Sequence, residues 1–135
     1  MRAIMIGSVL ALAVLAACKP QESDPLEALA PNVIWEVTEI AGQPVPANVE
    51  VTLTHPEKGL IAGNSGCNRY NGRISNQGGR VRVGELVGTR MACPADVMAV
   101  EGAFHSNIAR VDEVKIEDDR LQLMVDGKPV IIAKR

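Results

Sequence analysis

Apolar and polar residues alternate along most of the chain after Pro31, and this pattern predicts β-strands that are buried on one side. In the segment 33–40 Trp35 and Val37 share a face, and in 49–54 Val51 and Leu53 do the same. Further strands are expected at 60–64, 69–75, 80–88, 114–117, 120–126 and 128–135. The Gly78-Gly79 and Asp126-Gly127 pairs are hairpin signals between neighbouring strands.

One segment departs from this period of two and predicts a helix. Between residues 94 and 109 the apolar side chains recur every three or four positions, at Val97, Val100, Phe104 and Ile108. Pro94 is well placed for the first turn. The expected fold class is therefore α+β: about seven antiparallel strands in a strongly curved sheet, an open or cracked barrel, with one helix packed over its opening.

The first residues predict an export signal. Arg2 precedes an apolar run that ends at Cys18, and this run is shorter than the roughly 20 residues of a membrane-spanning helix. Residues 15–18, Leu-Ala-Ala-Cys, resemble the bacterial lipobox, in which cleavage leaves a cysteine that carries lipid. An ordinary signal cleaved after an A-x-A-like site, or a buried free Cys18, are the alternatives.

This interpretation divides the chain into three parts. Residues 1–17 form a lipoprotein signal peptide, residues 18–30 a lipidated cysteine with a flexible tether, and residues 31–135 one domain. Leu26 and Leu29 are apolar and could already pack against the domain, so the sequence leaves the boundary between tether and domain undetermined by several residues. Without residues 1–17 the chain has 13 basic and 16 acidic side chains and no long run of either sign. That balance and the scarcity of aromatic residues argue against a nucleic-acid partner.

Each of the three cysteines can be given a role if the chain is exported. If Cys18 carries lipid, Cys67 and Cys93 remain as a pair, and an oxidising compartment favours a disulfide between them. A metal site is not expected, because the two histidines and these two cysteines lack the close spacing of ligand pairs. No cofactor motif is found either: the phosphate-binding glycine loop and the G-x-S-x-G elbow are both absent.

A thiol-dependent enzyme is the rival interpretation of Cys67. Its nucleophile would need a base, and His55 and His105 are the available histidines, neither in a motif that would orient it. Arg69 or Arg90 would have to supply the charge that stabilises a thiolate. We expect both histidines to be structural instead.

The motifs carry a family resemblance. Trp35, the "SGCNRYNG" segment at 65–72, "TRMAC" at 89–93, Glu101 with Phe104, and "LQL" at 121–123 together resemble the META domain family, whose members include HslJ-like envelope lipoproteins. The resemblance implies a curved antiparallel sheet, a Cys67–Cys93 disulfide, and a link to heat stress and antibiotic tolerance, but no established reaction. Leu53 departs from the family pattern, where a phenylalanine is expected.

The favoured function is a non-enzymatic envelope lipoprotein that serves as a binding or structural module. Its expected partners are the membrane, through lipid on Cys18, and an envelope protein segment or apolar ligand on the curved sheet. Asn68, Tyr70, Asn71 and Arg90 are the candidate binding-surface or motif residues. Lys19 after the lipid cysteine resembles the sorting signal for the outer membrane, so we expect an outer-membrane anchor facing the periplasm. A pilot or chaperone-like role for an outer-membrane partner rests on analogy of fold alone.

Overall fold

The computed structural model of the chain describes residues 17–20 and 23–135. Residues 1–16 of the expected signal peptide, and residues 21–22 of the expected tether, lie outside the described residues. Within the described part, none of the helices combines the length and the apolar character needed to cross a membrane.

The described chain forms one 3₁₀ helix, one α-helix and ten strands, rather than about seven strands. The helices are η1 (Pro25–Ala28) and α1 (Ala95–Ile108). The strands are β1 (Trp35–Ile40), β2 (Gln43–Pro44), β3 (Thr52–Leu53), β4 (Leu60–Asn64), β5 (Arg69–Gln77), β6 (Arg80–Val83), β7 (Val87–Gly88), β8 (Glu113–Glu117), β9 (Arg120–Val125) and β10 (Lys128–Lys134). The difference lies in the short strands: β2 was not predicted, the expected strand 49–54 contains only the two residues of β3, and the expected strand 80–88 is divided into β6 and β7.

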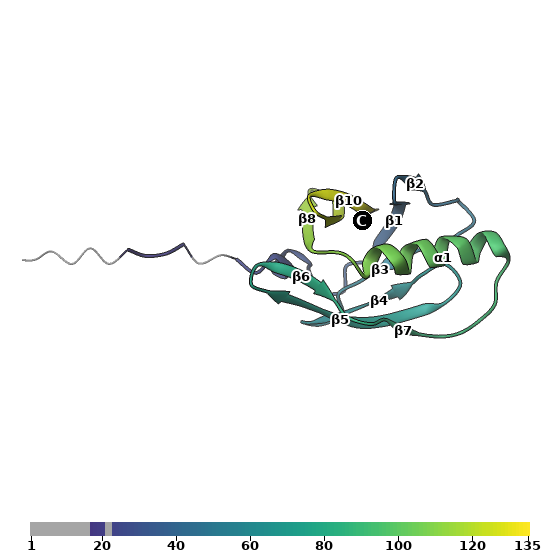
Figure 1. Ribbon diagram of the computed structural model, residues 1–135, viewed down its shortest axis with the longest axis horizontal. Coiled ribbons are helices and arrows are strands. Elements are labelled where there is room, and N and C mark those ends of the chain that lie inside the picture. Colours follow the sequence, from purple (N-terminus) through teal and green to yellow (C-terminus); the bar gives the residue numbers. More distant parts are fainter. Residues whose placement is uncertain (1–16, 21–22) are drawn as a thin grey trace, which may run out of the picture.

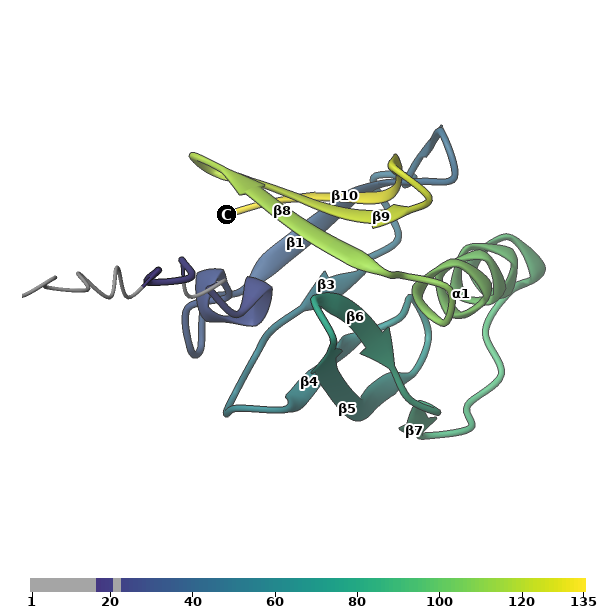
Figure 2. The same ribbon diagram turned by 60° about the vertical axis from the view of Figure 1, so that its left-hand side comes forward.

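The strands build two antiparallel sheets that face each other (Figures 1 and 2). One has the order β2-β1-β10-β9-β8, with β3 also on β1, and the other has β4-β5-β6, with β7 on β5. Isolated bridges from Val51 to Ser65 and from Thr54 to Ala62 connect the β3 segment to β4, so the two sheets are continuous through β3. Register irregularities in β1 and β10 are typical of β-bulges, which increase curvature. The structure thus confirms the α+β curved-sheet class.

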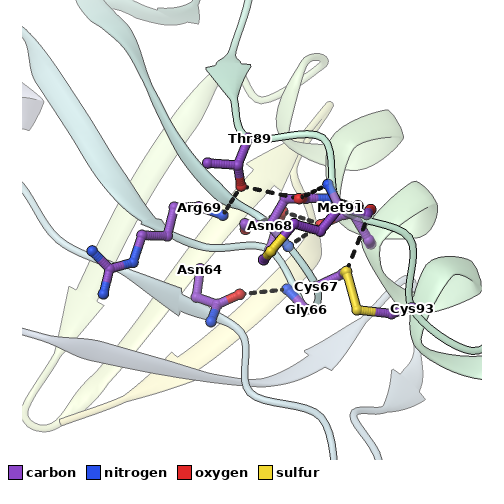
Figure 3. The surroundings of a disulfide bond; sticks show 10 residues. Asn64, Gly66, Cys67, Asn68, Arg69, Thr89, Met91 and Cys93 are labelled. Carbon is purple, nitrogen blue, oxygen red and sulfur yellow. Dashed lines mark hydrogen bonds between the residues drawn. A yellow bond between two sulfur atoms is a disulfide. The ribbon is translucent and has the colours of Figure 1, made fainter.

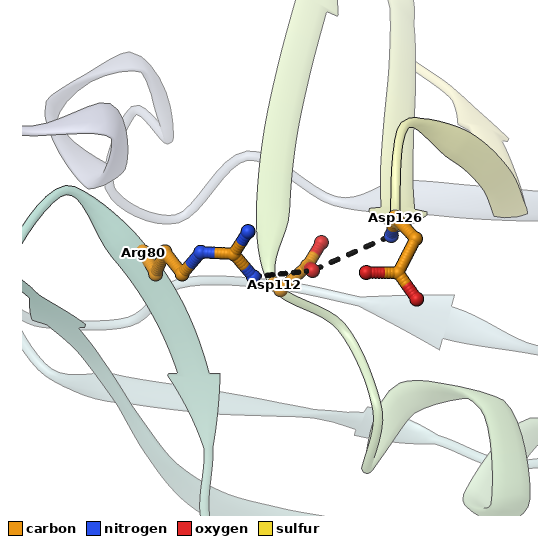
Figure 4. A network of polar contacts seen from close by, with 3 residues as sticks. All are labelled: Arg80, Asp112 and Asp126. Carbon is orange, nitrogen blue, oxygen red and sulfur yellow. Dashed lines mark hydrogen bonds and ion pairs between the residues drawn. The ribbon is translucent and has the colours of Figure 1, made fainter.

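On the opposite side the sheets approach without closing. The Val81 amide of β6 donates to the carbonyl of Asp112, just before β8, at 2.9 Å. The Arg80 guanidinium lies 3.0 Å from the Asp112 carboxylate, which also accepts from the Asp126 amide at 3.3 Å (Figure 4). These few contacts form a seam instead of a continuous strand ladder, so the structure is a cracked barrel.

The space between the sheets is filled by apolar side chains. Trp35 and Phe104 are the two largest fully buried residues, at 1% and 0% exposure. Aliphatic side chains from both sheets surround them, among them Val51, Leu53, Ile61, Val81, Leu121, Leu123 and Ile131. Residues that alternate inward along each strand therefore form one core, and the concave face of the sheet is occupied by the protein's own side chains.

Helix α1 covers one open end of this core (Figure 2). Pro94 sits at its N-cap, and Phe104 and Ile108 of the expected apolar stripe are fully buried, whereas Val97 and Val100 are partly buried. Glu101 and Asn107 are also buried. The helical prediction is confirmed, but its buried face includes polar residues.

The N-terminal segment occupies the end of the sheets opposite α1 (Figure 2). Leu26 of η1 and Leu29 are 8% and 2% exposed and belong to the core. The Leu29 carbonyl lies 3.0 Å from Nδ1 of His55, a ring that is itself buried. The packed structure therefore includes Leu26 and Leu29, the residues for which the start of the domain was left uncertain.

We predict that Leu29→Ala lowers the free energy of unfolding by about 2–5 kcal/mol, because it removes a fully buried side chain and leaves a cavity. Ile34→Ala is the matched control, since Ile34 is 67% exposed and its truncation should change stability by less than about 0.5 kcal/mol. Equilibrium urea unfolding of both variants measures the difference. Equal stabilities would mean that the segment before residue 31 is not part of the folded unit.

Candidate functional site

A disulfide joins the two cysteine motifs, as expected. Cys67 lies in the loop between β4 and β5, and Cys93 in the loop between β7 and α1 (Figure 3). The sulfur atoms are 2.05 Å apart and the Cα atoms 5.9 Å apart, within the usual range for a disulfide. Cys67 is consequently not a free thiol in this structure.

Glu101 binds the loop that contains Cys67 and is the centre of the site. Its side chain projects from α1 and the residue is 6% exposed. Oε1 accepts from the Ser65 hydroxyl at 2.7 Å and from the Asn68 amide N–H at 2.8 Å. Oε2 accepts from Nδ2 of Asn68 at 2.9 Å. No lysine, arginine or histidine in the described ranges forms an ion pair with Glu101, so hydrogen bonds alone satisfy this carboxylate.

The side chain of Asn68 uses its full hydrogen-bonding capacity. Besides its bond to Glu101, Nδ2 donates to the Met91 carbonyl at 3.2 Å, while Oδ1 accepts from the Met91 amide at 2.6 Å (Figure 3). Oδ1 also accepts from the Thr89 hydroxyl at 3.0 Å. The amide therefore pairs with Met91 as a neighbouring strand would, and holds the 89–93 segment beside the 65–68 loop.

These contacts have an electrostatic consequence for Glu101. Burial alone raises the pKa of a carboxyl group, but hydrogen bonds from Ser65, from the Asn68 side chain and from the Asn68 and Cys67 backbone lower it. Together the hydrogen bonds outweigh burial, and the pKa of Glu101 lies below its ordinary value. Glu101 is therefore an anion at neutral pH and an acceptor for all of these donors.

Local sequence explains the tight 65–68 loop. Gly66 has a φ of +125°, a conformation that favours glycine, and a Cβ there would lie 3.5–3.6 Å from atoms of Val49, Val97 and Glu101. The Asn64 side chain accepts from the Gly66 amide at 3.0 Å and fixes the turn. The glycine and asparagine of the motif thus shape backbone around the disulfide.

Tyr70 follows the loop and points into the core. It is 3% exposed, its hydroxyl donates to the Thr52 carbonyl at 2.9 Å, and its ring centroid lies 5.1 Å from that of Phe104. Burial raises the pKa of Tyr70, so its hydroxyl stays protonated and remains a donor.

The four residues expected at a binding surface divide into two pairs. Asn68 and Tyr70 are buried and hold the loop and the core, so of the two expected roles they take that of motif residues. Asn71 and Arg90 are exposed. No group of three or more His, Cys, Asp or Glu side chains in the described ranges is arranged to hold a metal ion.

The contacts found for the two histidines are with residues other than Cys67 and Cys93. His55 makes a polar contact with the Leu29 carbonyl, whereas the His105 ring lies 6.3 Å from Tyr70 and 5.8 Å from Phe104, centroid to centroid. The main residue that sequence reasoning did not single out as a site is Glu101. The sequence feature that could have identified it is the position of a glutamate on the apolar stripe of the predicted helix, four residues after Val97 and three before Phe104.

Comparison with known proteins identifies the family to which the chain is similar. The model of the family described as the META domain matches residues 27–135. No curated protein sequence matches the chain. A solved structure titled "NMR structure of the protein from Burkholderia xenovorans" is similar with a TM-score of 0.63 and 26% identity, over 94% of this chain and 98% of that one. A second solved structure, titled "NMR structure of the protein", has a TM-score of 0.58 and 21% identity, over 75% of this chain and 86% of that one. This likeness supports the fold alone.

We predict that Glu101→Gln lowers the free energy of unfolding by about 2–4 kcal/mol at neutral pH, since either amide orientation places an NH₂ against a buried donor. The effect should depend on pH. Because the pKa of Glu101 is lower in the folded protein than in the unfolded chain, its charge stabilises the fold above about pH 4–5, and this contribution is lost as the pH falls towards the folded pKa.

Denaturant unfolding between pH 7 and pH 3 measures this difference. The gap between the original protein and Glu101→Gln should narrow on acidification. Glu113→Gln, an exposed change on β8, should follow the original protein at every pH. A gap that stays constant with pH would contradict the role given to the carboxylate charge.

Removal of the disulfide should also cost stability. We predict that the double variant Cys67→Ala/Cys93→Ala loses about 3–4 kcal/mol, on the chain-entropy estimate for a closed loop of this length. Urea unfolding under oxidising conditions gives the value. Addition of reductant should destabilise the original protein towards the variant and leave the variant unchanged, and an insensitive original protein would show that the bond contributes little.

Proposed function

Because the chain belongs to the META domain family, we propose that it is a non-enzymatic lipoprotein of the bacterial cell envelope, anchored through Cys18 and carrying a disulfide-stapled binding or structural module. The anchor is proposed from the lipobox-like residues 15–18 and from Cys18, which is exposed and not disulfide-bonded. By the likeness of Lys19 to a sorting signal, the membrane is the outer one and the domain faces the periplasm.

One observation carries the non-enzymatic part of this proposal: the reactive side chains of the motifs are already engaged with each other. Cys67 is bonded to Cys93, and Glu101 and Asn68 bind one another and their neighbours in a buried position. A general base needs an accessible substrate proton, and a thiol nucleophile needs a free sulfur. The arrangement supports a structural role for these groups.

The same geometry favours an external binding surface over an internal ligand cavity. Trp35 and Phe104 fill the concave face of the sheet on which an apolar ligand was expected. The outer faces of the strands and the exposed side chains Val87 and Met91 remain accessible, at 65% and 57% exposure. A partner in the envelope would thus contact the outside of the domain. A contribution to heat-stress and antibiotic tolerance is proposed from the family resemblance.

The rival function is a thiol-dependent redox or hydrolytic enzyme that uses Cys67. It requires a reduced, reactive Cys67, and alkylation of the folded exported protein with and without reductant decides between the two. A pair that is blocked until reductant is added supports the structural function. Two free thiols that react rapidly at neutral pH would favour the enzyme.

We predict that the exported protein carries the added mass of lipid on Cys18 and fractionates with the membrane. Cys18→Ser should abolish both, because a hydroxyl does not replace the thiol in lipoprotein processing. Mass spectrometry of the N-terminal peptide and membrane flotation are the two measurements. Ser23→Ala is a matched control in the same segment and should leave both unchanged. Membrane association of Cys18→Ser without lipid mass would contradict anchoring through Cys18.

A further inference from the structure

The outward face of strands β4 to β7 carries a concentration of arginines that the balanced overall charge conceals. These strands contain four arginines and no acidic residue, whereas the strands of the other sheet contain four acidic and four basic residues. Alternation along β5 turns Arg69 and Arg73 outward, since Tyr70, Gly72 and Ile74 are buried. We call this surface the arginine face and define it by Arg69, Arg73, Arg80 and Arg82.

Strand register places all four arginines on the same side. Arg82 pairs with Ser75 and Arg80 with Gln77, and both partners share the outward side of β5 with Arg73. Residues 69 and 73 are separated by about 14 Å along one strand. Arg73 and Arg82 are diagonal neighbours on adjacent strands, with a separation of about 7–8 Å. The arrangement presents positive charge across a surface and not at one point.

Three of these arginines are available to a ligand. Arg80 is engaged with Asp112 at the seam, as Figure 4 shows. Arg69, Arg73 and Arg82 are exposed and have no acidic partner within 4.0 Å in the part of the chain that the structure describes. In Figure 3 the Arg69 side chain extends away from the disulfide and its hydrogen bonds. Its guanidinium is thus not required by the buried site.

The face is hollowed on either side of an exposed apolar residue. Val87 pairs with Asn71 and is 65% exposed. These two residues border both of two open hollows, of about 600 and 480 Å³, with Arg69 in the wall of one and Arg73 in the wall of the other. Acidic side chains also line both hollows: Glu50 the first, and Glu57 and Glu85, together with Lys58, the second. Each hollow therefore has one arginine of the face and Val87 in its lining, together with acidic side chains.

We propose that the arginine face binds the surface of a bilayer that contains anionic phospholipids, through the phosphate groups of their head groups. A guanidinium matches phosphate oxygens with two parallel hydrogen bonds, and Val87 adds an apolar contact at the interface. The choice of a membrane over an acidic protein rests on the proposed function. Leu26, which is buried, follows Cys18 by eight positions, a span of at most roughly 29 Å, so a lipid anchor would hold the domain at a bilayer.

Binding to vesicles tests this surface without the lipid anchor. The mature chain from residue 18, with Cys18→Ser and the disulfide formed, is sedimented with vesicles of phosphatidylcholine alone or of an equimolar mixture with phosphatidylglycerol. We expect binding to the anionic vesicles only, weakening as salt is added. The triple variant Arg69→Gln/Arg73→Gln/Arg82→Gln should reduce the partition coefficient on the order of a hundredfold, from roughly fivefold for each arginine.

A matched control separates a specific face from net charge. Lys115→Gln/Arg120→Gln/Lys128→Gln removes the same charge from exposed positions of the other sheet and should change binding by less than about twofold. Thermal unfolding checks that both triple variants fold. If the arginine triple variant does not fold, the single variant Arg73→Gln replaces it, and its partition coefficient should fall about fivefold.

Three results would overturn the inference. They are no binding to anionic vesicles at low salt, equal losses in the two triple variants, and binding to polyglutamate with none to vesicles, which would indicate an acidic protein partner instead. The lipid mass on Cys18 is measured separately, so failure of the anchor and failure of the arginine face are distinguishable.

Discussion

The buried carboxylate of Glu101 is the constraint on which the rest of the site depends. A charge taken out of water without a counterion is costly unless donors surround it, and Ser65 and Asn68 supply those donors from one short loop. That requirement fixes the loop against α1. Asn68 then fixes Met91 in the next loop, and the disulfide joins the same two segments covalently. Helix α1 is held over the open end of the core by these polar contacts as well as by Phe104.

Much of the fold was predictable because burial imposes a period on the sequence. The longer strands follow from the alternation of apolar and polar residues, and the helix from its apolar stripe. The turns at Gly78-Gly79 and Asp126-Gly127 follow from backbone preference, since each glycine of these pairs has a positive φ. The disulfide followed from counting cysteines. Glu101 was harder, because its partners lie 33 and 36 residues earlier, and no local pattern shows that a glutamate on an apolar face will meet them. For the same reason Asn68 and Tyr70 were candidates both for a binding surface and for a motif role: a motif identifies special residues but not whether they face inward.

The distribution of polar residues separates two tasks within the domain. The motif residues face inward and satisfy one another, so they maintain the corner between β5 and α1. The outward positions of β5, which alternate with the inward ones, are free to differ in charge without disturbing that corner. Arg69 illustrates the separation: its backbone amide donates to Thr89, while its side chain lies on the exposed side. Surface properties of the second sheet are thus set independently of the buried hydrogen bonds.

The pairing of β1 with β10 has a consequence for how the chain reaches this structure. Glu36 lies opposite Lys134, so the first long strand borders the last one. A chain that emerges from its N-terminus, from a ribosome or through an export channel, lacks this neighbour of β1 until residues 128–134 have appeared. Pairing over such a distance also slows folding, because a long loop must close before the contact forms. The topology itself therefore delays completion of the sheet until β10 has been synthesised or translocated, and β1 of a chain in transit has an unpaired edge up to that point.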